Sequence, residues 1–138
     1  HVINYTEKNF SNEVKQITDG KGVSAVYDGV GKKTLSGSTD CLRPRGMMIS
    51  FGNASGPLDP LDVPKYIQGK SLFFTRPTMK DYFSSREELD EASKALFKEI
   101  ISKKINIKIF KEYKLEEARK SHEDLEARKI TGPSILIP

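Results

Sequence analysis

Apolar runs alternate with amphipathic stretches along the first half of the chain. The apolar runs predict strands at residues 2–5, 23–28, 46–51 and 71–76. Between them, apolar residues recur with helical spacing on one face over residues 10–17 and again over residues 35–42. Strands that alternate with helices are typical of right-handed crossovers and a parallel sheet. The predicted fold class is therefore α/β.

The segment Gly46–Gly56 joins an apolar strand to a loop of small residues. An apolar run without alternation is typical of a strand that is buried on both faces. Small residues let the backbone approach a ligand closely, and ligands of open α/β sheets bind beyond the carboxyl ends of the strands. By itself the segment fits a binding loop and an ordinary turn after a buried strand equally well.

The second half of the chain contains the clearest helix signal. Ser85 with Glu88 forms a capping-box pattern, and residues 89–101 carry one apolar face with charges opposite. Isoleucines then alternate with polar residues over 105–110, which predicts a half-buried strand. The remaining predicted elements are short helices over 63–68 and 115–125 and an apolar strand over 134–137.

Composition narrows the classes of function. The 138 residues carry a formal net charge of +4, and the lysines are interspersed with glutamates, so no basic stripe for nucleic acid is present. A modest excess of positive charge favours anionic ligands such as phosphates. Cys41 is alone, which leaves no internal disulfide and no cysteine cluster for zinc, and fits a reducing compartment. No apolar run approaches the roughly 20 residues of a membrane helix.

Motifs of known catalytic chemistry are not found in the sequence. Neither G-x-G-x-x-G nor a phosphate loop occurs, and the nearest stretch, Gly29-Val30-Gly31, is more simply a tight turn between a strand and a helix. Asp28 before it could contact a ligand or stabilise the turn. His122 is expected on the apolar face of a helix as a packed imidazole, so no catalytic residue is assigned.

Five motifs in order carry a resemblance to a known family. They are VINY at 2–5, VYDGVG at 26–31, SFGNASG at 50–56, FTRP at 74–77 and LEARKITG at 125–132. The whole chain resembles the C-terminal portion of zeta-crystallin-type NADPH:quinone oxidoreductases of the medium-chain dehydrogenase/reductase superfamily. The resemblance implies a partial Rossmann domain, its third to sixth strands, over residues 1–103. Residues 104–138 would return to a GroES-like catalytic domain.

The resemblance also implies which residues bind the cofactor. Tyr5 would lie beside the adenosine ribose and its 2′-phosphate, and Val30 would line the adenine-side crevice. Arg128 would reach the cofactor phosphates from the catalytic domain. The residues expected near the nicotinamide and its ribose are Gly52, Asn53, Ala54, Ser55, Phe74, Thr75 and Arg76.

The implied reaction is the reduction of a quinone by NADPH without zinc. The implied assembly is a homodimer that pairs through the strand at 71–75, and the expected compartment is the cytoplasm, away from membranes. The chain starts at His1 without an initiator methionine, so we expect it to be part of a longer protein. Because the expected phosphate loop is not among its residues, we expect the chain alone to be nearly inactive.

Two other classes of function are compatible with a Rossmann-type sheet. A non-catalytic nucleotide- or RNA-binding module of the same fold is allowed, but not favoured, by the mild positive charge. A methyltransferase would bind S-adenosylmethionine instead of NADPH. Tyr5 together with Arg128 favours a phosphorylated dinucleotide over that ligand.

Overall fold

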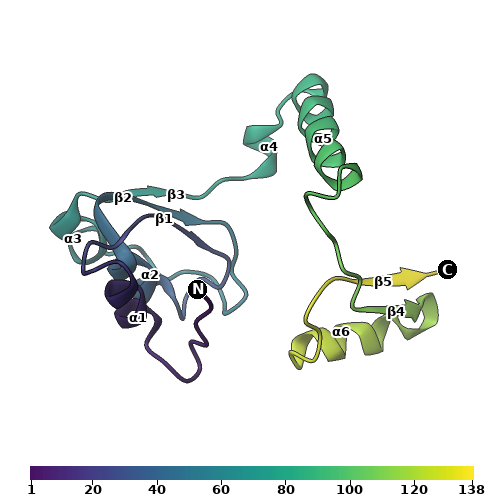
Figure 1. Cartoon of the computed structure of the whole chain (residues 1–138), viewed down its shortest axis with the longest axis horizontal. Coiled ribbons are helices and arrows are strands. Elements are labelled where there is room, and N and C mark those ends of the chain that lie inside the picture. The colour runs from purple at the N-terminus through teal and green to yellow at the C-terminus, as the bar shows by residue number, and fades with distance from the viewer. The chain divides into compact units, whose positions relative to one another are not determined.

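A computed structural model describes residues 1–138, which form two compact units (Figure 1). The first unit comprises His1–Ser84 and the second comprises Ser85–Pro138. Each unit is described by itself below.

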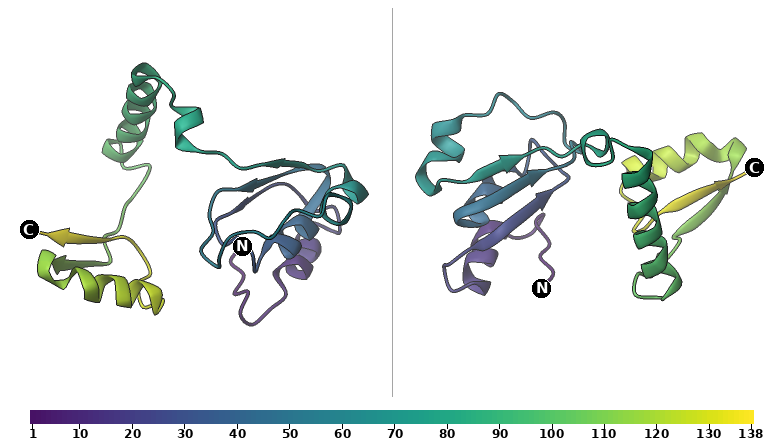
Figure 2. Two further views of the ribbon diagram at one scale, coloured as in Figure 1. Left: turned by 180° about the vertical axis from the view of Figure 1, so that it is seen from behind. Right: turned by 90° about the horizontal axis from the view of Figure 1, so that it is seen from above.

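The first unit is built on a parallel sheet of three strands (Figure 2). The strands are β1 (Val23–Asp28), β2 (Leu42–Ser50) and β3 (Phe73–Thr75), in the spatial order β1-β2-β3. Tyr27 lies opposite Ile49, and Ile49 lies opposite Thr75. The predicted α/β class and the parallel direction of the strands are confirmed.

The strand predicted at residues 2–5 is not formed. Val2 is fully exposed, and a turn follows in which the amides of Glu7 and Lys8 both donate to the carbonyl of Asn4 at 3.1 Å. A strand needs a neighbour that receives its backbone hydrogen bonds, and no strand of this chain lies beside these residues. The apolar run alone could not reveal that its partner is missing here.

Two helices cover one face of the sheet, α1 (Phe10–Ile17) and α2 (Leu35–Cys41), as predicted (Figure 1). Asn9 begins α1, where its side chain accepts a hydrogen bond from the amide of Asn12 at 3.1 Å. A β-carbon at Gly37 would clash with the ring of Phe10, so the absence of a side chain there lets the two helices approach.

The core of the first unit lies between this helical face and the sheet. It consists of Leu35, Leu42, Met48 and Leu72, all buried. The segment that joins β2 to β3 closes it with α3 (Val63–Tyr66) and a 3-10 turn, η1 (Gln68–Lys70). Residues of this segment that pack on the core are Leu58, Leu61, Tyr66 and Ile67.

The opposite face of the sheet, called the open face below, is only partly covered within the first unit, although Ile49 on it is buried. Tyr27 is 75% exposed, Met47 42% and Phe73 60%, and all three are directed away from the core. The prediction that the strand around Met47 is buried on both faces is therefore only half right. An unbroken apolar run specifies two apolar faces but does not specify what covers them.

The second unit consists of a long helix and a small parallel two-stranded sheet with its own helix. Helix α5 (Arg86–Ile101) begins at Ser85 with the predicted capping box. Its other elements are β4 (Lys111–Lys114), η2 (Leu115–Glu117), α6 (Ala118–Glu126) and β5 (Ser134–Ile137). Tyr113 of β4 is buried, and its hydroxyl donates to Asp124 of α6 at 3.0 Å.

The strand predicted over residues 105–110 is not formed, and pairing starts only at Lys111 opposite Ser134. The amide of Phe110 donates to the carbonyl of Pro133 at 2.8 Å, immediately before this ladder. Upstream of it, the alternating isoleucines are exposed and have no strand beside them. The alternating pattern therefore predicted a strand in nearly the right place. The position of the partner strand β5 decides that the pairing begins only at Lys111.

Methionines 47 and 48 provide a test of which face of the sheet forms the core. Met48 is 1% exposed and Met47 42% exposed. Met48→Ala should reduce the free energy of unfolding by about 2–5 kcal/mol, because it leaves a cavity in the core. Met47→Ala should reduce it by less than about 1 kcal/mol. Urea unfolding of both variants checks this, and equal losses would contradict the assignment of the two faces.

Candidate functional site

Two loops meet at the carboxyl edge of the sheet in the first unit. One follows β1 and the other follows β2, and backbone hydrogen bonds join them directly. The amide and the hydroxyl of Ser55 both donate to the carbonyl of Val30, at 2.8 and 2.7 Å. The amide of Ala54 donates to the carbonyl of Gly29 at 3.2 Å. Because the loops are bonded to each other, they form one continuous rim.

The buried carboxylate of Asp28 holds the first of these loops. It is 5% exposed and accepts hydrogen bonds from the amides of Val30 and Gly31 at 2.8 and 2.9 Å. The hydroxyls of Thr34 and Ser38 donate to it at 2.8 and 2.7 Å. The backbone carbonyl of Asp28 also accepts from Phe51 at 3.0 Å, which ties in the second loop. Asp28 therefore stabilises the turn, one of the two roles its position allowed.

The ionisation of Asp28 follows from these contacts. Burial raises the pKa of the carboxyl, but the hydrogen bonds from Gly31, Ser38, Thr34 and Val30 lower it by more, so the net pKa lies below its ordinary value of 3.8. The carboxylate is thus charged at neutral pH. It supplies acceptors for two amides of the turn after β1 and for the hydroxyls of Thr34, which precedes α2, and Ser38 within it.

Glycine is required where the two loops touch. Gly31 has φ +88°, and a β-carbon on it would lie 3.2 Å from the carbonyl oxygens of Gly52 and Gly56. A β-carbon on Gly52 would clash with the carbonyl oxygen of Gly29. The glycines are therefore needed for the contact between the two loops, where Gly31 is buried and Gly52 is half-buried.

Asn53 and Arg76, both predicted site residues, lie together at the end of β2. The guanidinium Nη1 of Arg76 donates to the carbonyl of Ser50 at 3.2 Å. With its carboxamide oriented so that the oxygen faces Arg76, Asn53 accepts from Nη2 at 3.2 Å. Arg76 thereby joins the end of β3 to the loop after β2.

Tyr5 and Val30 also lie together, although residues 2–5 do not form the predicted strand. Both line a shallow hollow of about 210 Å³ beside Phe10. The rings of Tyr5 and Phe10 meet edge to face with 6.3 Å between their centroids. Packing against α1, rather than pairing in the sheet, brings Tyr5 to the rim.

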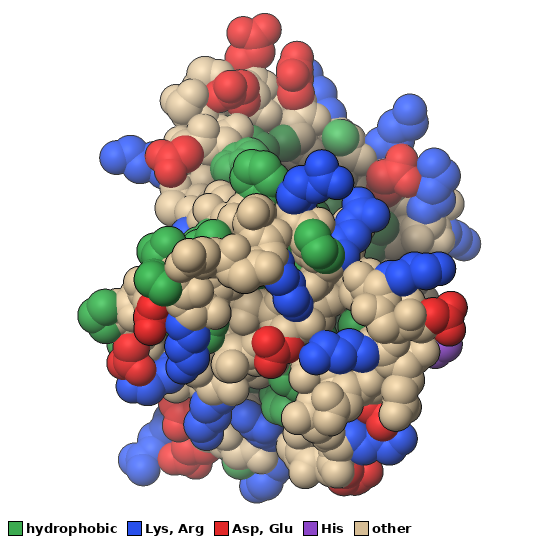
Figure 3. All heavy atoms as spheres, turned by 90° about the vertical axis from the view of Figure 1, so that its left-hand side faces the viewer, with side chains coloured by type: hydrophobic (Ala, Val, Ile, Leu, Met, Phe, Trp, Pro, Cys, Tyr) green, Lys and Arg blue, Asp and Glu red, His purple; other side chains and the backbone are tan.

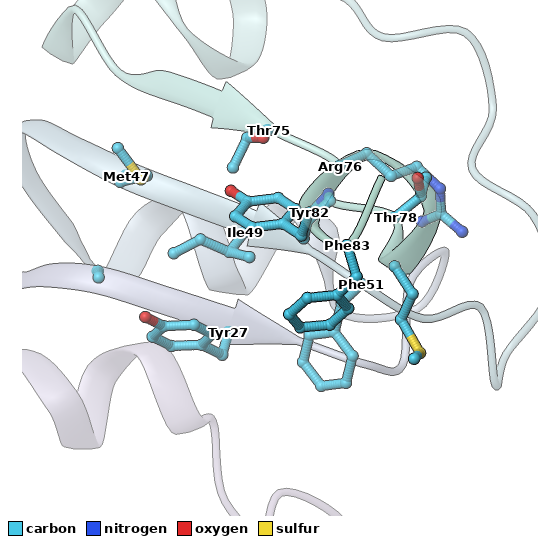
Figure 4. Close-up of a pocket in the computed structure, with 12 residues that line it drawn as sticks. Tyr27, Met47, Ile49, Phe51, Thr75, Arg76, Thr78, Tyr82 and Phe83 are labelled. Atoms are coloured by element: carbon cyan, nitrogen blue, oxygen red, sulfur yellow. The ribbon is translucent and has the colours of Figure 1, made fainter. Parts of the chain in front are cut away.

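Two adjacent predicted residues of β3 lie on opposite faces of the sheet. Phe74 packs on the buried core, so its side chain is not at the rim. Thr75 and Arg76 line a hollow of about 760 Å³ on the open face. Figure 4 shows the side chains of this hollow. They include Tyr27, Met47 and Ile49 from the strands, Phe51 from the loop after β2, and Tyr82 and Phe83 from α4 (Met79–Tyr82) and its end.

Arg128, the remaining predicted residue, belongs to the second unit. It follows α6 in a left-handed conformation with φ 56°, and its side chain is exposed. Its amide donates to the carbonyl of Leu125, and the amide of Lys129 donates to that of Asp124, both at 3.0 Å. This pair of bonds is the usual C-terminal closure of a helix, with arginine where glycine is preferred.

The sequence contains a signal for the supporting role of Asp28. Thr34 and Ser38 follow Asp28 by six and ten residues, so they lie one helical turn apart on the same face of α2. Hydroxyls at that spacing, after a strand that ends in aspartate, predict a carboxylate bonded to the start of the helix.

Asp28→Asn should destabilise the chain by about 1–3 kcal/mol at neutral pH, because the amide loses one acceptor and places a donor against donors. The lowered pKa means that the contribution of the carboxylate is fully present above about pH 4 and is lost as pH falls through the folded-state value. Thermal unfolding of both proteins between pH 7 and pH 2 measures this. A difference in stability that stays constant down to the lowest pH would contradict it.

Comparison with known proteins places the chain in a family. A family model described as zinc-binding dehydrogenase matches residues 1–136. The chain is 48% identical to a quinone oxidoreductase of Salmonella typhimurium over 99% of its length, and 43% identical to a 2-haloacrylate reductase of a Burkholderia species over 100%. It superposes on a crystal structure of Escherichia coli quinone oxidoreductase complexed with NADPH with a TM-score of 0.94 and 45% identity, covering 100% of this chain and 43% of that one.

These relatives are longer than the chain, which spans 42% of the length of each of the two curated ones and matches their C-terminal portion. They favour the oxidoreductase interpretation over the RNA-binding and methyltransferase alternatives.

Zinc, which the description of the family names, does not fit the residues of this chain. No group of three or more His, Cys, Asp or Glu is arranged to hold a metal. Cys41 is buried, and His122 is exposed on α6 rather than packed as expected.

None of the helices combines the length and the apolar character that a membrane-spanning helix requires. By sequence and fold, the chain belongs to the zinc-binding dehydrogenase family of the medium-chain dehydrogenase/reductase superfamily.

Proposed function

We propose that this chain forms the NADPH-binding and C-terminal portion of an oxidoreductase that reduces quinones. The observation that carries the proposal is the rim in which two glycine-containing loops are bonded to each other at the carboxyl edge of a parallel sheet. In open α/β sheets this edge is the usual place for a nucleotide. The relative with the same fold at 45% identity was crystallised with NADPH.

Residues of the first unit would hold most of the cofactor. Tyr5 and Val30, which share one hollow, would take the adenosine end. The loop from Gly52 to Ser55, in which Asn53 and Ala54 are exposed, would pass along the nicotinamide ribose. Thr75 and Arg76 would border the nicotinamide itself.

The domain assignment rests on the same resemblance. Residues 1–103 would belong to the cofactor-binding domain and residues 104–138 to the catalytic domain. Arg128 would then approach the cofactor phosphates from the catalytic domain, and a guanidinium is suited to bind phosphate oxygens through two parallel hydrogen bonds.

The chemistry would come from the cofactor, which supplies a hydride when bound. The residues of this chain would bind and orient it and exclude water from one side. A quinone is the proposed acceptor because most of the similar curated relatives are quinone oxidoreductases. The 43% identical 2-haloacrylate reductase supports an activated carbon–carbon double bond as a second class of acceptor.

A homodimer through the strand at 71–75 is the proposed assembly. Within the first unit β3 pairs with β2 only, so its other edge has backbone groups without strand partners. The proposed compartment is the cytoplasm, which agrees with a free, buried Cys41.

Arg128→Gln tests the assignment of the cofactor. It should weaken NADPH binding about tenfold or more, because a charge-assisted hydrogen bond to phosphate is lost. Titration of the chain with NADPH, read by cofactor fluorescence, measures this, and the chain contains no tryptophan to interfere. Arg119→Gln is the matched control, since Arg119 is also exposed on α6 and pairs only with Glu123. If both variants bind NADPH with the same affinity as the parent chain, Arg128 does not contact the cofactor.

Phe73→Lys tests the proposed dimer. A charge at an edge strand opposes strand pairing between copies, so the variant should sediment as a monomer where the parent chain forms a dimer. Met79→Lys is the control, because Met79 is similarly exposed and apolar but lies outside β3. Sedimentation velocity at several concentrations gives the answer, and an unchanged dimer in Phe73→Lys would refute pairing through this strand.

A further inference from the structure

Strand β2 contains a large bulge near its amino end. Val23 of β1 lies opposite Leu42, but Ala25, only two residues further on, lies opposite Met47. The residues 43–46 therefore have no partner in β1 and loop out of the ladder. Bulges of this kind re-aim side chains and are common next to functional sites.

The backbone of this bulge is tightly folded. Arg45 has φ 60°, in the left-handed region that favours glycine. A β-carbon on Gly46 would lie 2.9 Å from the carbonyl oxygen of Arg43, so the next residue has to be small. Arg45 therefore carries backbone strain that a glycine at this position would not have.

The bulge and the turn before β1 together form a basic hollow. Its volume is about 550 Å³, and it is lined by Lys21, Arg43, Pro44 and Arg45. None of the three cations forms an ion pair, although Asp19 and Asp40 are close in sequence. By contrast, the ammonium of Lys70 donates to the carbonyls of Thr39, Asp40 and Leu42 and is thus already satisfied.

Figure 3 shows lysine and arginine side chains interspersed with carboxylates on the face that it draws, whereas no carboxylate lines the basic hollow. Three cations around one hollow without a carboxylate are complementary to a compact anion of more than one charge. Two guanidinium groups and an ammonium are the donors that bind phosphate oxygens.

We propose that the basic hollow binds a small anion that bears phosphate groups, at the amino edge of the sheet and away from the rim at the carboxyl edge. The size of the hollow is that of a small-molecule site. Its lining contains no aromatic side chain on which a base could stack, which argues against single-stranded nucleic acid as the ligand.

Pyrophosphate is the probe for this site, added to the nitrogen-15-labelled chain and followed by NMR at low ionic strength. The amide signals of Lys21, Arg43, Arg45 and Gly46 should move and saturate. In the double variant Arg43→Gln with Arg45→Gln, the affinity should fall at least about tenfold. The control, Lys80→Gln with Lys94→Gln, removes the same charge from exposed lysines elsewhere and should bind like the parent chain.

A second variant separates binding from folding. Arg45→Gly keeps the left-handed backbone without strain, so it should raise the melting temperature while it weakens pyrophosphate binding. The proposal is overturned if pyrophosphate moves only the signals of residues 29–31 and 52–55, or if the control loses as much affinity as the arginine variants. NADPH should still move the signals of residues 52–55 in the double arginine variant. The experiment therefore tests the proposed anion site separately from the proposed NADPH site.

Discussion

The rim at the carboxyl edge depends on one buried carboxylate. Asp28 ends β1, and its side chain accepts from two amides of the following turn, from the hydroxyl of Thr34 just before α2 and from that of Ser38 within it. Its backbone carbonyl accepts from the loop after β2. One residue thus fixes the exit of a strand, the start of a helix and the path of the neighbouring loop. A buried anion with four donors is stable only as a complete set, since each donor would otherwise be buried without a partner.

The rim so fixed is made of backbone rather than of reactive side chains. Gly31 and Gly52 leave no room for β-carbons, and Asn53 and Arg76 bond each other and the strand end. Such a surface can position a ligand and exclude water but supplies no acid, base or nucleophile. It therefore suits a function in which the cofactor carries the reactive atom, as in the quinone oxidoreductases to which the chain is similar.

Apolar surface remains exposed in each unit considered alone. Tyr27 and Phe73 stand out from the open face of the first sheet, and Leu96 and Phe97 are half exposed on α5. Exposed apolar side chains in such number mark surfaces that other protein covers. The relatives, of whose length the chain spans 42%, contain further residues that could do so. The basic hollow at the amino edge is different, because charge rather than apolar area distinguishes it.

The sequence by itself determined the elements whose stability is local. Helices α1 and α2 and the capping box of Ser85 and Glu88 form where they were predicted. Each of them depends on residues that are only a few positions apart. Only the tertiary structure decided which apolar segments became strands, which face of β2 was buried and which site residues met. Residues 2–5 and 105–110 have strand-like patterns but lack a neighbour, and Phe74 faces the core while Thr75 faces the open side. A strand forms only when its backbone groups make hydrogen bonds to a neighbouring strand that is distant in the sequence. The local pattern of residues does not show whether such a neighbour is present.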